Sequence, residues 1–218
     1  ISSFVTNSVT TMNGMFNGCW SLTSLDVSHF NTDNVTDMLS MFRDMHQIKS
    51  LDVTNFNTIN VTRMDGMFSD CSRLGYDAST PTVTPTIEPL DVTNFDTRNV
   101  ENFREMFRNV KLSSLDVTNF DTSSATNMKS MFDGMTELES LDITNFDTSN
   151  VTEMNSMFEN CKLITSLDVT NFDTSNVTDM SFMFSGCNSL TSLDLTGYPA
   201  PTTTETATFL GFNTANVT

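Results

Sequence analysis

A motif of about 26 residues recurs from one end of this 218-residue chain to the other. Part of one copy, residues 172–187, reads FDTSNVTDMSFMFSGC. Self-similarity at a period of roughly 20–50 residues is the sequence mark of stacked repeats. The aromatic anchor of the motif recurs in steps of 26, 26, 39, 25, 26, 26 and 40 residues, at Phe4, Phe30, Phe56, Phe95, Phe120, Phe146, Phe172 and Phe212. The period therefore predicts one elongated stack of coils.

The irregular steps mark departures from an otherwise constant repeat. Two insertions, 75–89 and 197–211, account for the long steps, and a deletion of one residue near Lys111 accounts for the short one. We therefore predict a single domain over 1–218, made of about seven repeats. The chain enters and leaves in the middle of a repeat and has no polar capping coils, which soluble stacks normally need. We expect a fragment of a longer protein.

The large apolar residues keep the register of the repeat. All 15 methionines fall at three phases, and 15 of the 18 phenylalanines fall at two. Stacked coils place equal phases above one another, so these residues form continuous apolar ladders. A methionine stripe could also make a soft-metal site or an adaptable groove. Because leucine, valine and phenylalanine recur in step with it, we predict core filling and no cofactor.

The cysteines follow the same logic. All four cysteines share one phase, and the nearest two are 26 residues apart. They are Cys19, Cys71, Cys161 and Cys187. On the expected helical side of the stack, elements pack about 8–10 Å apart, whereas a disulfide needs Cα atoms within about 7 Å. Methionine or valine takes this phase in other repeats. We predict buried, unpaired thiols.

Each repeat combines two local patterns. Residues 190–195 (LTSLDL) alternate apolar and polar side chains, which predicts a short strand. Val177, Met180, Phe184 and Cys187 are spaced as one face of a short helix. The predicted fold is an α/β solenoid: a right-handed leucine-rich-repeat stack with one parallel sheet of short strands, and short helices or 3-10 turns on the other face. An all-β solenoid is the alternative, because so short a helix is marginal by itself.

The complete motif reads MF-x-x-C-x-x-L-x-SLDV-x-x-FDT-x-NVT-x-M, and it resembles the BspA-like leucine-rich repeats of bacterial surface proteins. The resemblance covers the whole chain. It implies an extracellular protein on the bacterial cell surface, acting in adhesion by binding a host or matrix protein or glycoprotein. A passive structural spacer or stalk is the alternative. The resemblance carries over no catalytic residue.

An enzyme is not expected from the residues either. The sequence has no Ser–His–Asp set, P-loop or metal-ligand motif. Its two histidines, His29 and His46, occupy positions filled by ordinary residues in other repeats. No apolar run is long enough to span a bilayer, so direct membrane insertion is not expected. We predict a monomer, apart from end-to-end contacts of uncapped repeats.

The charge is strongly acidic and ordered. With 27 acidic and 10 basic residues the net charge is −17, which argues against nucleic acid as a partner. One column of carboxylates follows the strand leucines, at Asp26, Asp52, Asp91, Asp116, Asp142, Asp168 and Asp194. These side chains could be solvated, hydrogen-bonded by Thr, Ser, Asn and turn amides, or bound to a divalent cation. We expect no metal site, with a cation at Asp116, Asp142 and Asp168 as the alternative.

The departures from the repeat are the candidate ligand site, because a perfect repeat has no unique surface. Loops on a rigid scaffold often carry function, and aromatic and arginine side chains dominate many interfaces. The predicted ligand-binding residues are Tyr76, Arg98, Arg104, Arg108, Lys111 and Tyr198. The positive charges of the arginines and the lysine would orient an anionic partner. The alternative is a tolerated insertion together with ordinary pairing of these arginines to Glu101 and Glu105.

Overall fold

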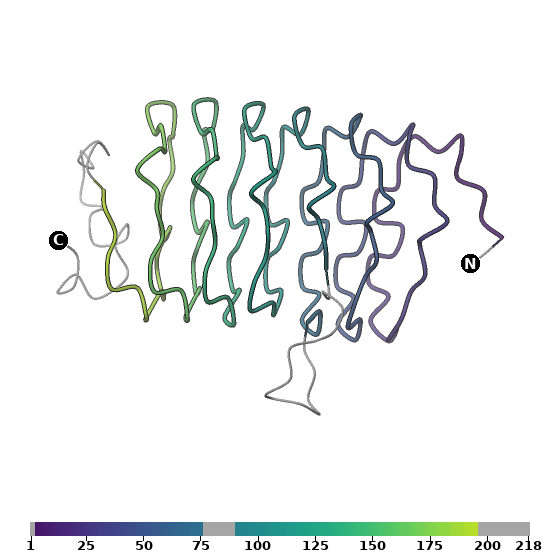
Figure 1. Cartoon of the computed structure of the whole chain (residues 1–218), viewed down its shortest axis with the longest axis horizontal. Coiled ribbons are helices and arrows are strands. Elements are labelled where there is room, and N and C mark those ends of the chain that lie inside the picture. Colours follow the sequence, from purple (N-terminus) through teal and green to yellow (C-terminus); the bar gives the residue numbers. More distant parts are fainter. Residues whose placement is uncertain (1–2, 76–89, 196–218) are drawn as a thin grey trace.

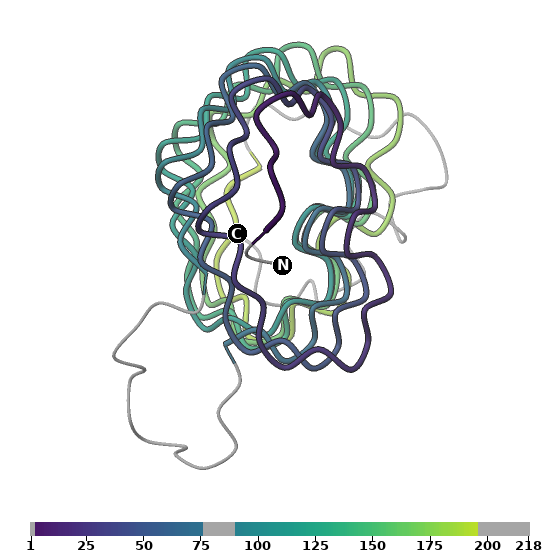
Figure 2. The ribbon, with the colours of Figure 1, turned by 90° about the vertical axis from the view of Figure 1, so that its right-hand side faces the viewer.

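The chain forms a row of similar coils that follow one another along a single axis (Figure 1). The computed structural model describes residues 3–75 and 90–195. Seen end on, the coils superpose in an elongated loop (Figure 2), so residues one repeat apart lie above one another. Tyr76, Tyr198, Phe212 and the two insertions, apart from Gly75, lie outside the described residues.

Parallel β-bridges join consecutive coils at the residue that precedes the first methionine position of each repeat, as Thr11 precedes Met12. Six of them link seven coils: Thr11–Asp37, Asp37–Arg63, Arg63–Asn102, Asn102–Asn127, Asn127–Glu153 and Glu153–Asp179. We call the segment 11–19 and its equivalents the methionine side, and 22–28 and its equivalents the leucine side. On the leucine side, where the sequence predicts the sheet, the described bridges are Leu51–Leu90 and Ser166–Ser192. In the described residues every bridge is isolated, and no strand of two or more residues forms.

The short helices that the apolar spacing predicts do not form in the described part of the chain. The methionine side is instead a run of turns. In the first coil the Met15 N–H donates to the Met12 carbonyl at 3.2 Å, and Gly14 between them has a φ of +61°. Gly18, four residues further on, has a φ of +72°. A right-handed helix requires negative φ throughout, so a left-handed residue at every fourth position replaces the helix with successive turns.

Both left-handed positions recur in every described coil. The second is occupied by Gly18, Asp44, Asp70, Asn109, Gly134, Asn160 and Gly186, all with positive φ. Glycine, asparagine and aspartate tolerate this conformation best. The first position is less well matched, because it holds Glu105 at φ +57° and Phe182 at φ +60°. The repeated turn geometry therefore overrides local preference in those two coils.

The turns direct alternate backbone amides along the axis of the stack. In the first pair of coils four N–H groups donate over 2.8–2.9 Å to the next coil: Met12 to Asp37, Gly14 to Leu39, Phe16 to Met41, and Gly18 to Arg43. The same four bonds recur at all six described interfaces between methionine sides. All run in one direction, from the N–H of one coil to the carbonyl of the following coil. Consecutive coils are thereby locked in one register.

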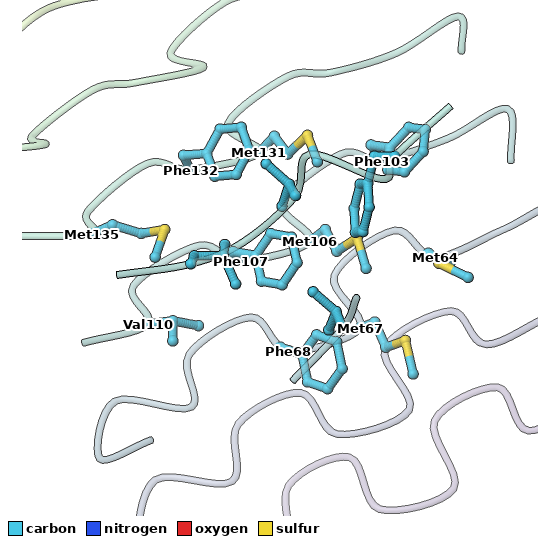
Figure 3. Packing of buried hydrophobic residues seen from close by; sticks show 14 of the residues in the cluster. Met64, Met67, Phe68, Phe103, Met106, Phe107, Val110, Met131, Phe132 and Met135 are labelled. Atoms are coloured by element: carbon cyan, nitrogen blue, oxygen red, sulfur yellow. The ribbon is translucent and has the colours of Figure 1, made fainter. Parts of the chain in front are cut away.

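A column of stacked phenylalanine rings runs through the core beside these hydrogen bonds. Neighbouring ring centroids lie 5.6–5.9 Å apart with interplanar angles of 4–11°, a stacked geometry. The members of this phenylalanine column are Phe16, Phe42, Phe68, Phe107, Phe132, Phe158 and Phe184. Figure 3 shows Phe68, Phe107 and Phe132 among the methionines of the same coils. The aromatic and methionine phases together fill the interior.

The prediction of core filling by methionine is confirmed, and so is that of buried, unpaired thiols for three of the four cysteines; Cys19 is free but half-buried. Thirteen methionines are buried, and Met15 and Met180 are half-buried against the same core. Cys71, Cys161 and Cys187 are buried and unpaired, and each Sγ donates to a phenylalanine carbonyl at 3.0–3.2 Å. Burial raises the pKa of Cys71 and of Cys187 to about 12. These groups are therefore neutral thiols at physiological pH.

A buried threonine supplies a second polar link between coils. Thr122 is 1% exposed; its Oγ1 donates to the Asp147 carbonyl at 2.9 Å and accepts from the Asp147 N–H at 2.8 Å. The same pair of bonds is made by Thr6, Thr32 and Thr58. A threonine occurs at this phase in every described repeat, but the sequence pattern alone did not predict its role. Its hydroxyl satisfies backbone groups that the turn leaves without a partner.

Valine at position 122 should separate the contribution of the threonine hydroxyl from that of the side-chain volume. Thr122→Val keeps the volume but leaves the Asp147 N–H and carbonyl without their partner. We expect the free energy of unfolding in urea to fall by about 1–3 kcal/mol. The matched variant Thr122→Ser retains the hydroxyl and should retain the hydrogen bonds. A valine variant as stable as the wild type would show that the hydroxyl does not hold the coils together.

Candidate functional site

The structure places Arg104 in an ion-pair network that spans several coils. The Glu105 carboxylate lies 2.8 Å from Arg104 and 2.9 Å from Arg43, which belongs to the coil two repeats earlier. Gly66, in the coil between, leaves room for this crossing, because a Cβ there would lie 3.1 Å from the Arg43 guanidinium. Burial acts to raise the pKa of Glu105, but the hydrogen bonds from Arg104 and Arg43 outweigh it and lower this pKa.

Arg108 extends the network to two further carboxylates. Its Nη1 lies 3.4 Å from Asp70 and its Nε lies 3.2 Å from Asp133. Asn109 also donates to Asp70, at 2.7 Å. Burial raises the pKa of Asp133; the hydrogen bond from Arg108 opposes this shift, and the charge of Glu159 adds to it. Arg43 and Arg108 are therefore paired with acids of other coils, whereas Arg104 is paired with the adjacent Glu105.

The other two predicted basic residues have partners of their own. Arg98 pairs with Asp96 at 2.8 Å, at an exposed turn. The Lys111 ammonium donates to Thr136 Oγ1 at 2.7 Å and to a backbone carbonyl at 3.4 Å. Arg104 and Arg108 share one network, whereas Arg98 and Lys111 make separate contacts.

The basic cluster thus joins coils as well as presenting charge. The alternative of ordinary arginine–glutamate pairing correctly named Glu105, but the contact comes from adjacent and stacked residues rather than from one helix face. Tyr76 and Tyr198 lie outside the described residues. An anion-binding site at these six positions stays a prediction.

The aspartate column on the leucine side is held by its own turns. Asp116 Oδ1 accepts from the Thr118 N–H at 3.0 Å and from Thr118 Oγ1 at 2.7 Å. The same two bonds are made at Asp26, Asp52, Asp91, Asp142 and Asp168. They lower the pKa of Asp26, Asp116, Asp142 and Asp168. This is the hydrogen-bonded alternative of the three that the sequence left open.

The alternative cation site at Asp116, Asp142 and Asp168 has no support from the arrangement of ligands. Within 3–75 and 90–195, no three His, Cys, Asp or Glu side chains are grouped so that they could hold a metal ion. Calcium requires about six to eight oxygen ligands. A single column supplies its carboxylates one coil at a time.

A groove of about 420 Å³ lies on the leucine side, over residues 90–93, 114–118 and 140–142. Its lining includes buried Leu90 and Leu115 beside the carboxylates Asp91, Asp116 and Asp142. None of its described lining residues is Lys, Arg or His. We call this feature the leucine-side groove.

The leucine-side groove lies over coils whose leucine sides no described bridge joins to one another. From Leu90 to Ser166 no bridge joins the described leucine sides, and none joins 22–28 to 48–54 either. No backbone hydrogen bond joins the described residues 90–93 to 113–118. The deletion near Lys111 falls within this stretch and shortens the connection into 112–118. A loosened leucine side therefore coexists with a fully bonded methionine side.

Sequence reasoning missed the leucine-side groove and three members of the ion-pair network, Arg43, Asp70 and Asp133. The only signal for the groove was the deletion near Lys111, which identified the irregular coil but not the face that it opens. The network could not be found by sequence spacing, because Arg43 and Glu105 are 62 positions apart and meet only through stacking.

These observations define a repeat protein, built of stacked coils with one irregular region. The chain matches the family described as "Mycoplasma protein of unknown function, DUF285" over residues 1–88 and 82–198. Since these matches span most of its length, the protein belongs to that family. No curated protein matches the chain. Within the residues that the structure describes, no helix has the length and apolar character needed to cross a membrane.

The ion pairs of Glu105 predict a specific pH dependence of stability. Because the pKa of Glu105 is lowered in the folded state, its stabilising contribution is complete above its ordinary value of 4.5. That contribution is lost as the pH falls through the lowered value. We expect Glu105→Gln to reduce the free energy of unfolding at pH 7 by about 1–2 kcal/mol and to flatten its decline below pH 4.5.

Urea denaturation over this pH range measures both effects. Glu139→Gln is the matched control, because Glu139 is exposed and its side chain makes no described contact. Identical pH profiles for Glu105→Gln and the wild type would contradict the assigned role of the network.

Proposed function

We propose that this protein is a non-enzymatic repeat module of the BspA-like leucine-rich-repeat kind, displayed on the bacterial cell surface. Its role in this proposal is adhesion, through binding of a host or matrix protein or glycoprotein. The observation that carries the proposal is the leucine-side groove. It is a hollow confined to three coils of a repetitive stack, and a specific partner requires a feature of this kind.

The solenoid class is part of the same proposal. Parallel bridges between coils, the 26-residue step and buried leucines at one phase support a leucine-rich-repeat stack. The turns on the methionine side favour the all-β alternative over a helical back, because left-handed residues interrupt any helix there. Handedness of the stack remains an expectation.

A passive spacer is the second candidate, and one observation favours it. Four one-directional hydrogen bonds and a stacked ring at every described interface make a stiff rod. A rod of this kind would hold another domain away from the cell surface. A spacer has no use for a groove lined by carboxylates that no described basic side chain pairs with, however, so we rank adhesion first.

Binding to a panel of immobilised host components tests the proposal. We would pass the protein over fibronectin, laminin, collagen and mucin and measure the response by surface plasmon resonance. Adhesion predicts saturable binding to at least one component, with loss of binding by the heat-unfolded protein. Absence of saturable binding to every component would leave the spacer as the better account.

A further inference from the structure

The shape and charge of the leucine-side groove point to a specific kind of occupant. We propose that it docks a short, extended segment of a partner protein that carries both basic and apolar side chains. This inference rests on the proposed binding function and deepens it, since it names the site and the chemistry of the partner.

The dimensions of the groove suit an extended segment. It spans three coils, those of Asp91, Asp116 and Asp142. Neighbouring strands lie about 4.8 Å apart and an extended chain rises about 3.3 Å per residue. Because the leucine sides are unpaired here, the three carboxylates cover at least about 10 Å, the length of three or four extended residues.

Among the residues that the structure describes, no basic side chain pairs with the carboxylates of the groove. Each of Asp91, Asp116 and Asp142 uses Oδ1 to accept from its own threonine, and Oδ2 has no described hydrogen bond. The described lining holds no basic side chain. By contrast, acids on the methionine side such as Asp70 and Asp133 are paired with Arg108. Lysine or arginine side chains from a partner would neutralise these carboxylates.

The apolar lining separates a peptide from a simple cation. Leu90, Val92 and Leu115 line the groove below the carboxylates and are 6%, 1% and 8% exposed. A metal ion or a polyamine would use the carboxylates alone. A peptide with alternating basic and apolar side chains would use both, although these three side chains leave only a small apolar area to cover, at roughly 25 cal/mol per Å².

The repeat provides matched controls outside the groove. Asp168 has the same phase, the same threonine hydrogen bonds and the same lowered pKa as Asp142, yet it does not line the groove. Ser166 is likewise the equivalent of Ser140, which does line it. Both serines are exposed.

The test uses a fluorescent heptapeptide, Lys-Leu-Lys-Ser-Lys-Leu-Lys, and fluorescence anisotropy. We expect Asp116→Asn combined with Asp142→Asn to weaken its binding at least tenfold, and Asp168→Asn to change it less than twofold. Filling the groove with Ser140→Trp should also weaken binding at least tenfold, whereas Ser166→Trp should not. Circular dichroism checks that each variant is folded.

Three outcomes would overturn the proposal. Equal weakening by Asp168→Asn would mean that the general acidic field binds the peptide. Full competition by spermine at the same concentration as unlabelled peptide would mean that charge alone suffices. No measurable binding by the folded wild type would mean that the groove is not a docking site for such a segment.

The result is separable from that of the adhesion experiment. Host-protein binding that survives Ser140→Trp would retain adhesion and overturn the groove as its site. Peptide binding that depends on the groove, with no binding to any host component, would retain the groove and overturn adhesion.

Discussion

The contact between successive methionine sides is the interaction on which the rest of the structure depends. Left-handed residues at two positions of each coil produce turns, and the turns aim alternate N–H groups along the axis. Those bonds set the separation at which the phenylalanine rings stack, with centroids 5.6–5.9 Å apart. Hydrogen bonding and ring stacking thus require the same register, so each stabilises the other.

In this arrangement the two sides of a coil have different roles. The methionine side holds neighbours together at every described interface, so the leucine side is free to vary in its pairing. A coil can lose a residue near Lys111 and open a groove without disrupting the stack. The ion pairs that cross from Arg43 to Glu105 reinforce the methionine side at the same coils. A rigid scaffold whose leucine sides are only partly paired is suited to presenting a binding surface.

The core was predictable from the sequence, whereas the secondary structure and the site were not. Phases shared by methionine and phenylalanine identify buried positions because stacking converts a sequence period into a spatial column. Periodicity alone cannot distinguish a helix from successive turns when apolar residues lie three or four apart. Gly18, Asp70 and Asn109 at one phase were the available evidence for turns, since these residue types favour left-handed backbone.

The groove was harder to predict for a physical reason. It depends on which coils fail to pair on the leucine side, and that is a property of the assembled stack rather than of any one repeat. The ion-pair network is similar, because its partners are brought together across intervening coils. Of the partners of the basic cluster, the sequence therefore predicted Glu105 but not Asp70 or Asp133.

Native-state hydrogen exchange tests the central claim most directly. The amides of Phe107, Phe132 and Phe158 all donate between coils, so they should exchange through one common opening with the free energy of global unfolding. Phe132→Ala should lower that free energy by about 3–5 kcal/mol at all three positions together. A loss of protection confined to the coil of Phe132 would contradict the account, because the coils would then be holding themselves together independently.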